Sequence, residues 1–267
     1  MTVAIIGAGV MGESLLSGLI RGGHEIADLV VGETRSERAV ELREKYGVEV
    51  LANIDAAARA DTVALVVKPQ DMGDVLTEIA PHLRAGQVLI SLAAGITTDY
   101  IEKHIPDGIA VVRVMPNTPA LVDEGMAAIS AGTHCDEEHL ALAEGMMSVT
   151  SRVVRVPENQ QDAITAISGS GPAYLFFVVE SMIEAGVHLG LPRSTATELV
   201  IQTMVGSAKL LRETGTHPTV LREQVTSPGG TTAAAIRQLE DHKVRAAFIM
   251  AMEAARDRSV ALAASDD

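Results

Sequence analysis

The sequence predicts an α/β protein in which a doubly wound parallel sheet is followed by an all-helical domain. Three observations support this prediction. A short β-branched run at residues 3–6 passes directly into Gly-x-Gly-x-x-Gly at residues 7–12. Strand-like and helix-like runs then alternate up to about residue 157, as repeated strand–helix–strand units require. No strand-like run follows residue 157, and helical patterns continue from there.

The first strand, turn and helix carry a dinucleotide-binding signature of the Rossmann type. Gly7 permits the tight turn, Gly9 lets a pyrophosphate approach the backbone, and Gly12 lets the helix pack closely on the strand. The first N–H groups and the positive dipole end of the helix would face the phosphates. A glycine-rich turn that binds nothing is the alternative, but the strand–turn–helix context favours a ligand. The predicted loop consists of Gly7, Ala8, Gly9, Val10, Met11 and Gly12.

The remaining strands and helices of the sheet follow in order. We expect strands at residues 28–31, 48–50, 62–67, 88–91, 110–115, 127–130 and 152–156. Helical patterns lie between them at residues 37–46, 55–60, 72–83, 98–104 and 137–149. The nearly continuous apolar run at 62–67 is typical of a strand that is buried on both faces of a parallel sheet. We therefore assign residues 1–157 to a dinucleotide-binding Rossmann domain.

Residues 158–267 form the second predicted domain, which is all-helical. Helical patterns cover residues 160–167, 173–189, 192–213, 219–225, a stretch ending at 239, and 244–261, and we expect residues 259–267 to fray. Residues 168–172 interrupt the first of these patterns and predict a kink that serves packing. Long apolar helices rich in alanine, in so short a domain, favour pairing with a second copy over a monomeric bundle.

Ligands of doubly wound sheets bind outside the carboxyl ends of the strands. The sequence places five short segments at those ends, residues 7–12, 32–35, 68–69, 93–95 and 115–119. We expect these segments to line one crevice. The small side chains at residues 93–95 would leave room there for a flat ring.

The end of the second strand gives two conflicting indications of cofactor choice. Glu33 lies 21 residues after Gly12, about where an acid binds the adenosine 2′-hydroxyl of NAD. Thr34 and Arg35 follow at once, and a hydroxyl beside a guanidinium suits the 2′-phosphate of NADP. We favour NADPH, with NADH as the alternative.

A second glycine-rich segment, Ser-Pro-Gly-Gly-Thr-Thr at residues 227–232, precedes a helix of the second domain. Its two glycines allow unusual backbone angles and a close approach of ligand to backbone. The hydroxyls, the free N–H groups and the helix dipole together favour a small anion, either a carboxylate or a phosphate. N-capping of the helix by Ser227 or Thr231 is the alternative, which the residues by themselves leave open.

Charge and composition argue against several classes of partner. The formal net charge of −14 argues against nucleic acid and against an anionic membrane. The single cysteine, Cys135, allows no intramolecular disulfide, and the spacing of His and Cys indicates no metal site. We find no targeting signal and no apolar run that approaches the length of a membrane span, and we expect a cytoplasmic protein.

Six segments resemble those of the pyrroline-5-carboxylate reductase family, in the family's order and over nearly the whole chain. They are residues 6–12, 67–69, 91–95, 115–119, 168–174 and 227–232. The last two are specific to this family, whereas the first is shared by many dehydrogenases. The resemblance implies reduction of L-1-pyrroline-5-carboxylate to L-proline by NAD(P)H, the last step of proline synthesis. It also implies a homodimer with interlocked helical domains, often assembled further.

The resemblance also implies site residues. On the cofactor side these are the loop at residues 7–12, then Thr34, Asn53, Val67, Lys68, Pro69, Ala93, Ala94 and Gly95, and, within another matching segment, Asn117. On the substrate side they are Ser227, Gly230, Thr231 and Thr232. Thr232, the expected catalytic residue, would hydrogen-bond the ring nitrogen, and the others would hold the carboxylate. A protonated cyclic imine is a strong electrophile, so hydride transfer needs positioning more than a strong acid or base.

Two other interpretations remain. A β-hydroxyacid dehydrogenase of the 3-hydroxyisobutyrate type would share the N-terminal fold and the helical second domain. It normally needs a catalytic lysine in a glycine-rich helix, however, and residues 168–180 contain no lysine. A non-enzymatic NADPH-binding sensor would keep residues 7–12 but would not need a second anion site at residues 227–232.

Overall fold

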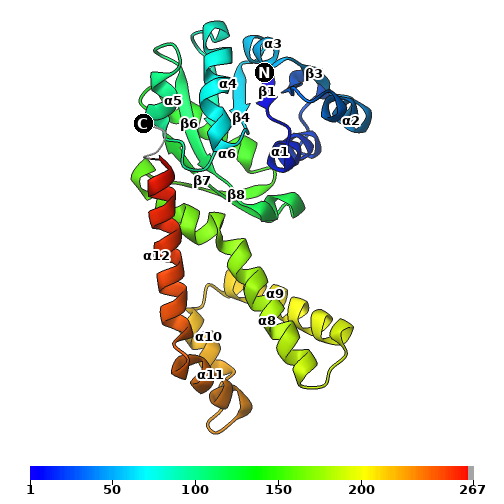
Figure 1. Cartoon of the computed structure of the whole chain (residues 1–267), viewed down its shortest axis with the longest axis vertical. Helices are drawn as coiled ribbons and strands as arrows, with labels where there is room; N and C mark the ends of the chain where they lie inside the picture. The colour runs from blue at the N-terminus through cyan, green and yellow to red at the C-terminus, as the bar shows by residue number, and fades with distance from the viewer. Residues whose placement is uncertain (264–267) are drawn as a thin grey trace. The chain divides into compact units, whose positions relative to one another are not determined.

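The computed structural model describes residues 1–263 and divides into two compact units (Figure 1). Unit 1 contains Met1–Ser170 together with the chain from Ala255 onward, and unit 2 contains Gly171–Ala254. These units are not identical with the predicted domains, residues 1–157 and 158–267, because the helical segment up to Ser170 packs with unit 1. The predicted division after residue 157 stays a prediction.

Unit 1 is built on an eight-stranded sheet with the order β3-β2-β1-β4-β5-β6-β7-β8. Its strands are β1 (Val3–Ile6), β2 (Leu29–Gly32), β3 (Glu49–Leu51), β4 (Thr62–Leu65), β5 (Val88–Ser91), β6 (Ala110–Met115), β7 (Gly125–Ala131) and β8 (Ser151–Arg155). The chain winds outward from β1 in both directions, which confirms the predicted doubly wound sheet. Among the strands of residues 1–263, only β6 and β7 pair antiparallel. Residues 116–124, which join them, are fewer than the dozen or so that a parallel crossover requires.

Helices cover both faces of this sheet (Figure 1). They are α1 (Val10–Arg21), α2 (Ser36–Tyr46), α3 (Asn53–Arg59), α4 (Met72–Ile79), α5 (Thr98–Lys103), α6 (Glu137–Met147) and α7 (Gln161–Ile164). Val3 and Ile5 of β1 pack with side chains of α1, α2 and α6. Ala4 and Ile6 pack with those of α3, α4 and α5. Because successive side chains of a strand point to opposite faces, the central strands need the uninterrupted apolar runs seen in the sequence.

The ends of several elements differ from the sequence prediction. The strand predicted at 62–67 ends at Leu65, where the chain turns past Gly7. The predicted fraying from Ser259 is wrong within the described residues, because α12 (Val244–Ala263) continues through it. Ser259 is buried, and its hydroxyl donates a hydrogen bond of 2.7 Å to Asp162. Residues 264–267 lie outside the described residues.

A buried charge connects the sheet to the segment that follows it, and no sequence pattern predicts this contact. Arg113 of β6 is only 3% exposed, and its guanidinium lies 3.3 Å from Glu158 and 3.9 Å from Asp162. Glu158 also accepts hydrogen bonds from the backbone and the hydroxyl of Thr98 at the start of α5. A buried charge is tolerated only when it is paired, so this cluster fixes the residues that lead into α7.

Unit 2 is helical throughout, as predicted. It contains α8 (Gly171–His188), α9 (Arg193–Thr214), α10 (Pro218–Gln224), α11 (Thr231–Asp241) and the first part of α12. Gly186 of α8 lies so close to Ala196 of α9 that an added Cβ would come within 2.9 Å of the alanine Cβ. The interruption predicted at residues 168–172 is a π-helical turn at Thr165–Gly169, which leads from α7 into α8.

Unit 2 exposes an unusual amount of apolar surface. Phe176 and Phe177 of α8 are 66% and 69% exposed. The helical run Glu158–His188 is long and apolar enough, by length and composition alone, to cross a membrane. The expectation that no apolar run approaches this length is therefore wrong. Only 11% of the run's most apolar window is buried within the chain, and apolar faces of this size mark contact surfaces.

Candidate functional site

The glycine-rich turn after β1 is fixed by close packing at two of its three glycines. Gly7 has a φ of +90°, and a Cβ placed on it would lie 2.7 Å from the carbonyl oxygen of Val66. A Cβ on Gly12 would lie 2.1 Å from the carbonyl oxygen of Gly7. No larger residue fits either position without moving backbone, so α1 can start this close to β1 only with glycine at both places.

The third glycine, Gly9, is different because a Cβ there would meet no atom within 4 Å. Gly9 is the N-cap of α1 and offers no side-chain cap to the first turn of the helix. Val10, the next residue, is 65% exposed. The first N–H groups of α1 therefore adjoin open space that a phosphate could fill, and the residues present fit a dinucleotide.

Arg38 of α2 fixes the glycine-rich turn by contacts with Ala8 and Glu13. Its Nε donates a 3.0 Å hydrogen bond to the carbonyl oxygen of Ala8, and its Nη2 pairs with Glu13 of α1. Glu13 also accepts hydrogen bonds of 2.8 Å from Lys45 and from the Tyr46 hydroxyl. With the Ala8 carbonyl oxygen bound to Arg38, the turn keeps one backbone orientation. No sequence pattern predicts this cluster, because its members come together only when α1 and α2 pack side by side.

These contacts change the ionisation of Glu13. The hydrogen bond from Lys45, with those from Arg38 and Tyr46, lowers the pKa of Glu13 to about 2, although partial burial acts in the opposite direction. Glu13 is therefore ionised at neutral pH, and its charge keeps Arg38 in place beside the turn.

The other predicted cofactor segments lie along the same edge of the sheet. The strand register sets Ile6 level with Gly32 on one side and with Leu65 on the other, and Leu65 level with Ser91. The segments that follow these four strands are therefore neighbours, as expected. They contain the glycine-rich turn, Thr34 and Arg35, then Val67, Lys68 and Pro69, and finally Ala93, Ala94 and Gly95.

Two of the predicted cofactor residues have partners within the chain. Asn53, the first residue of α3, is buried and donates a 2.9 Å hydrogen bond to Glu78. Asn117 donates from its amide to the carbonyl oxygen of Ser168, and its amide oxygen accepts from the backbone of Met126. Asn117 thus links the segment after β6 to β7 and to the π-helical turn. A cofactor-binding role for either asparagine stays a prediction.

The second glycine-rich segment lies in unit 2, between α10 and α11. Gly229 has a φ of +69°, and the N–H of Gly230 donates a 3.0 Å hydrogen bond to the carbonyl oxygen of Ser227. Gly230 is the N-cap of α11, so neither Ser227 nor Thr231 caps this helix. In the part of the chain that the structure describes, the hydroxyls of Ser227, Thr231 and Thr232 have no hydrogen-bond partner. These hydroxyls and the first N–H groups of α11 remain available to a ligand.

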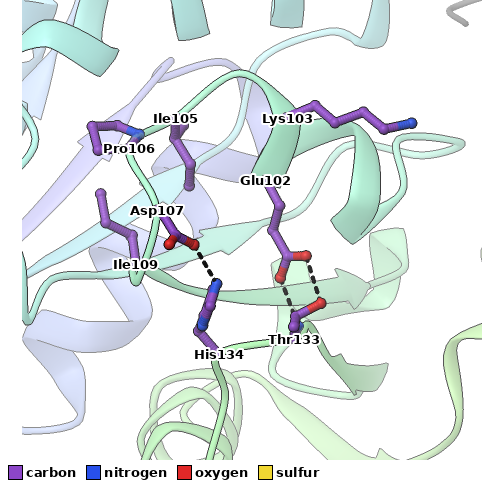
Figure 2. A pocket seen from close by; sticks show the side chains of 8 residues that line it. All are labelled: Glu102, Lys103, Ile105, Pro106, Asp107, Ile109, Thr133 and His134. Atoms are coloured by element: carbon purple, nitrogen blue, oxygen red, sulfur yellow. Dashed lines mark hydrogen bonds and ion pairs between the residues drawn. The ribbon is translucent and has the colours of Figure 1, made fainter.

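A cavity of about 220 Å³ lies elsewhere in unit 1, where α5 ends and β6 begins (Figure 2). Apart from Lys103, which pairs with Asp99, its polar side chains contact one another. Asp107 lies 2.9 Å from His134, and Glu102 accepts hydrogen bonds from the backbone and hydroxyl of Thr133. The lining of this cavity therefore does not indicate a ligand site. Among residues 1–263, no three His, Cys, Asp or Glu side chains are grouped to hold a metal.

The doubly wound sheet, the open glycine-rich turn and the start of α1 without a side-chain cap are the features of a dinucleotide-binding protein. A protein of Corynebacterium melassecola called pyrroline-5-carboxylate reductase is 46% identical to this chain over 262 residues, which cover 97% of each chain. The chain therefore belongs to the pyrroline-5-carboxylate reductase family.

Two family models and two solved structures support membership of this family. Residues 158–262 match the family model for pyrroline-5-carboxylate reductase dimerisation, and residues 2–95 match that for coenzyme F420-dependent NADP oxidoreductases. The solved structure of a pyrroline-5-carboxylate reductase from Coxiella burnetii is 38% identical, covers 98% of each chain and superposes with a TM-score of 0.92. A Plasmodium falciparum pyrroline carboxylate reductase solved with NADP bound is 29% identical over 98% of each chain, with a TM-score of 0.89.

The Glu13 cluster predicts a specific dependence of stability on pH. The folded pKa of about 2 lies below the ordinary value of 4.5, so Glu13 stabilises the fold above pH 4.5 and this contribution is lost as the pH falls from 4.5 toward 2. Glu13→Gln should lower the free energy of unfolding by about 1–3 kcal/mol at neutral pH, because Arg38 and Lys45 lose a charged partner.

The measurement is urea unfolding at a series of pH values, with Glu44→Gln on the exposed side of α2 as the matched control. The difference between Glu13→Gln and the parent should narrow steadily below pH 4.5. A difference that is the same at neutral and acid pH would show that the charge of Glu13 contributes nothing to stability.

Proposed function

We propose that this chain reduces L-1-pyrroline-5-carboxylate to L-proline with a hydride from NAD(P)H, the last step of proline biosynthesis. The observation that carries the proposal is the identity of 46% with a protein of that name over 97% of both chains. Two glycine-rich helix starts, one in each unit, support it further. An oxidoreductase of this kind needs one anion site for a dinucleotide and another for the substrate carboxylate.

The cofactor residues of the proposal lie in unit 1. The first turn of α1 binds the pyrophosphate with its N–H groups. The hydrogen bond from Arg38 keeps the Ala8 carbonyl oxygen away from the pyrophosphate. NADPH is the proposed main donor, and the relative solved with NADP bound supports this choice. NADH is the second donor. The bound nicotinamide supplies the hydride, and the small residues Ala93, Ala94 and Gly95 leave space for its ring.

The substrate residues of the proposal lie in unit 2. The ring nitrogen of the protonated imine carries an N–H and has no free lone pair. The hydroxyl oxygen of Thr232 therefore accepts a hydrogen bond from this N–H and orients the ring. The hydroxyl of Ser227 and the N–H of Thr231 bind the carboxylate. The N–H of Gly230 is already bonded to the carbonyl oxygen of Ser227, so Gly230 shapes the turn instead of binding the substrate through its amide. Positioning of this kind suffices, because an iminium carbon is already electrophilic.

A hydroxyacid dehydrogenase is the weaker candidate. A Mycobacterium tuberculosis 3-hydroxyisobutyrate dehydrogenase superposes on 72% of this chain, but at 16% identity the likeness concerns the fold alone. The glycine-rich helix α8, from Gly171 to His188, contains no lysine that could act as the acid–base group of such an enzyme. This difference favours reduction of an imine over reduction of a carbonyl group.

We also propose that the chain works as a homodimer through its helical region, assembled further into a larger homo-oligomer, in the cytoplasm. The family model for dimerisation covers residues 158–262, and Phe176 and Phe177 of α8 lie exposed in a single copy. Light scattering of the purified protein should give at least twice the chain mass of 28.0 kDa. A monomer at micromolar concentration would contradict this assembly.

The assigned role of Thr232 is tested in an assay of NADPH oxidation with pyrroline-5-carboxylate. Thr232→Ala should lower kcat/KM about ten- to hundredfold, since a lost hydrogen bond to a charged group costs about 1.5–3 kcal/mol. Thr203→Ala is the matched control, because the Thr203 hydroxyl bonds only within α9, to the carbonyl oxygen of Leu199. Parental kcat/KM in Thr232→Ala, with the same thermal stability, would remove Thr232 from the site.

A further inference from the structure

Residues 92–97 join β5 to α5 and include the three small residues that leave space for the nicotinamide ring in the proposed function. The sheet fixes one end of this segment. Ser91, the last residue of β5, is fully buried and pairs with Arg113 of β6 in the strand register. Within the segment the chain turns at Gly95, whose φ of +81° lies in the region that favours glycine. The position of the turn therefore depends on what holds the other end.

Glu158 holds the other end of the segment. Thr98, the first residue of α5, is buried and donates twice to the Glu158 carboxylate. Its backbone N–H donates to one oxygen at 2.8 Å and its hydroxyl donates to the other at 2.5 Å. The first of these oxygens also accepts from Nη1 of Arg113 at 3.3 Å. Both ends of residues 92–97 are thus attached to Arg113, one through Ser91 and the other through Thr98 and Glu158.

Arg113 itself has little freedom to move. Its side chain is only 3% exposed and lies between two carboxylates, those of Glu158 and Asp162. Asp162 also accepts a hydrogen bond of 2.7 Å from Ser259 of α12. Displacement of the guanidinium would leave a charge unpaired in the interior, which is costly. Arg113 is therefore a fixed point from which the segment after β5 is held at both ends.

The placement of this segment matters because hydride transfer is sensitive to distance. The reacting atoms must approach to about 3–3.5 Å, and a misplacement of about 1 Å can cost about 100-fold in rate. The proposed function assigns neither Arg113 nor Thr98 to the cofactor or to the substrate. Their influence on the nicotinamide ring is therefore indirect and passes through the backbone of residues 92–97.

We propose that Arg113 and Thr98, connected through Glu158, are positioning residues for hydride transfer, because they hold residues 92–97 where the nicotinamide ring meets the substrate. The inference rests on the proposed function, since it concerns the hydride donor of that reaction. The pyrophosphate site at α1 is fixed separately, by the contacts of Arg38. Loss of the connection therefore slows hydride transfer while leaving the affinity for the cofactor almost unchanged.

Thr98→Val tests the connection, because valine keeps the shape of the side chain but lacks the hydroxyl that donates to Glu158. In the assay with NADPH and pyrroline-5-carboxylate, it should lower kcat about tenfold while the NADPH Kd stays within about twofold of the parent. Thr98→Ser keeps the hydroxyl and should leave kcat within about twofold of the parent. Thr77→Val is the matched control, because the Thr77 hydroxyl bonds within α4, to the carbonyl oxygen of Gly73.

A second readout uses the intact protein with saturating NADPH and no substrate. The fluorescence lifetime of bound NADPH reports on the ring, because a nicotinamide held in place emits for longer than one that moves in water. The lifetime should shorten in Thr98→Val and return to the parental value in Thr98→Ser. Arg113→Lys keeps the buried charge but not the guanidinium fork, and it should shorten the lifetime in the same way. This variant decides the question by itself if Thr98→Val does not fold.

Parental kcat and lifetime in Thr98→Val would overturn the inference. Equal losses in Thr98→Val and Thr98→Ser would also overturn it, because Thr98 would then act through packing and not through its hydroxyl. A rise in the NADPH Kd as large as the fall in kcat would show that cofactor binding as a whole is disturbed, against the inference. Failure of the proposed function looks different: the parent would not reduce pyrroline-5-carboxylate, while the lifetimes would still depend on the Thr98 hydroxyl.

Discussion

The cofactor edge of unit 1 depends on one steric constraint, the approach of α1 to the carbonyl oxygen of Gly7. A single methyl group on Gly12 would come within 2.1 Å of that oxygen. With glycine there, α1 starts directly above β1, its first N–H groups face open space at Gly9, and Glu13 comes within reach of Arg38 and Lys45 on α2. Movement of α1 away from β1 would disturb the anion site and the charge cluster that holds it from behind.

The two glycine-rich helix starts, at α1 and α11, both begin at a glycine N-cap without a side-chain cap, but they differ in shape. At α1 the packed glycines Gly7 and Gly12 flank an open one, so a large diphosphate can lie against the backbone. At α11 the turn is closed by the hydrogen bond from Gly230 to Ser227, and three threonine and serine hydroxyls stand near the helix start. This arrangement suits a small anion with a polar group beside it. In the proposed function the first helix start binds the dinucleotide and the second binds the substrate.

Much of this could be predicted from the sequence, because it depends on local patterns. The apolar runs of the central strands and the glycine spacing are local, and so the doubly wound sheet and the site segments along its edge were expected. Contacts between residues that lie far apart in the sequence were not predicted. The pairing of Arg113 with Glu158 and the Glu13–Arg38 cluster both arise from packing between elements. The antiparallel pairing of β6 and β7 follows from the short connection between them. The apolar pattern of a strand does not show in which direction it pairs.

The central claim, that this chain delivers a hydride from a nicotinamide cofactor to a cyclic imine acid, is tested most directly by following the hydride itself. Purified protein is incubated with L-1-pyrroline-5-carboxylate and NADPH that carries deuterium at the transferable position, and the products are analysed by mass spectrometry. The expected product is L-proline with one deuterium for every NADPH consumed. Consumption of NADPH without labelled proline, or no consumption by a folded protein that binds NADPH, would contradict it.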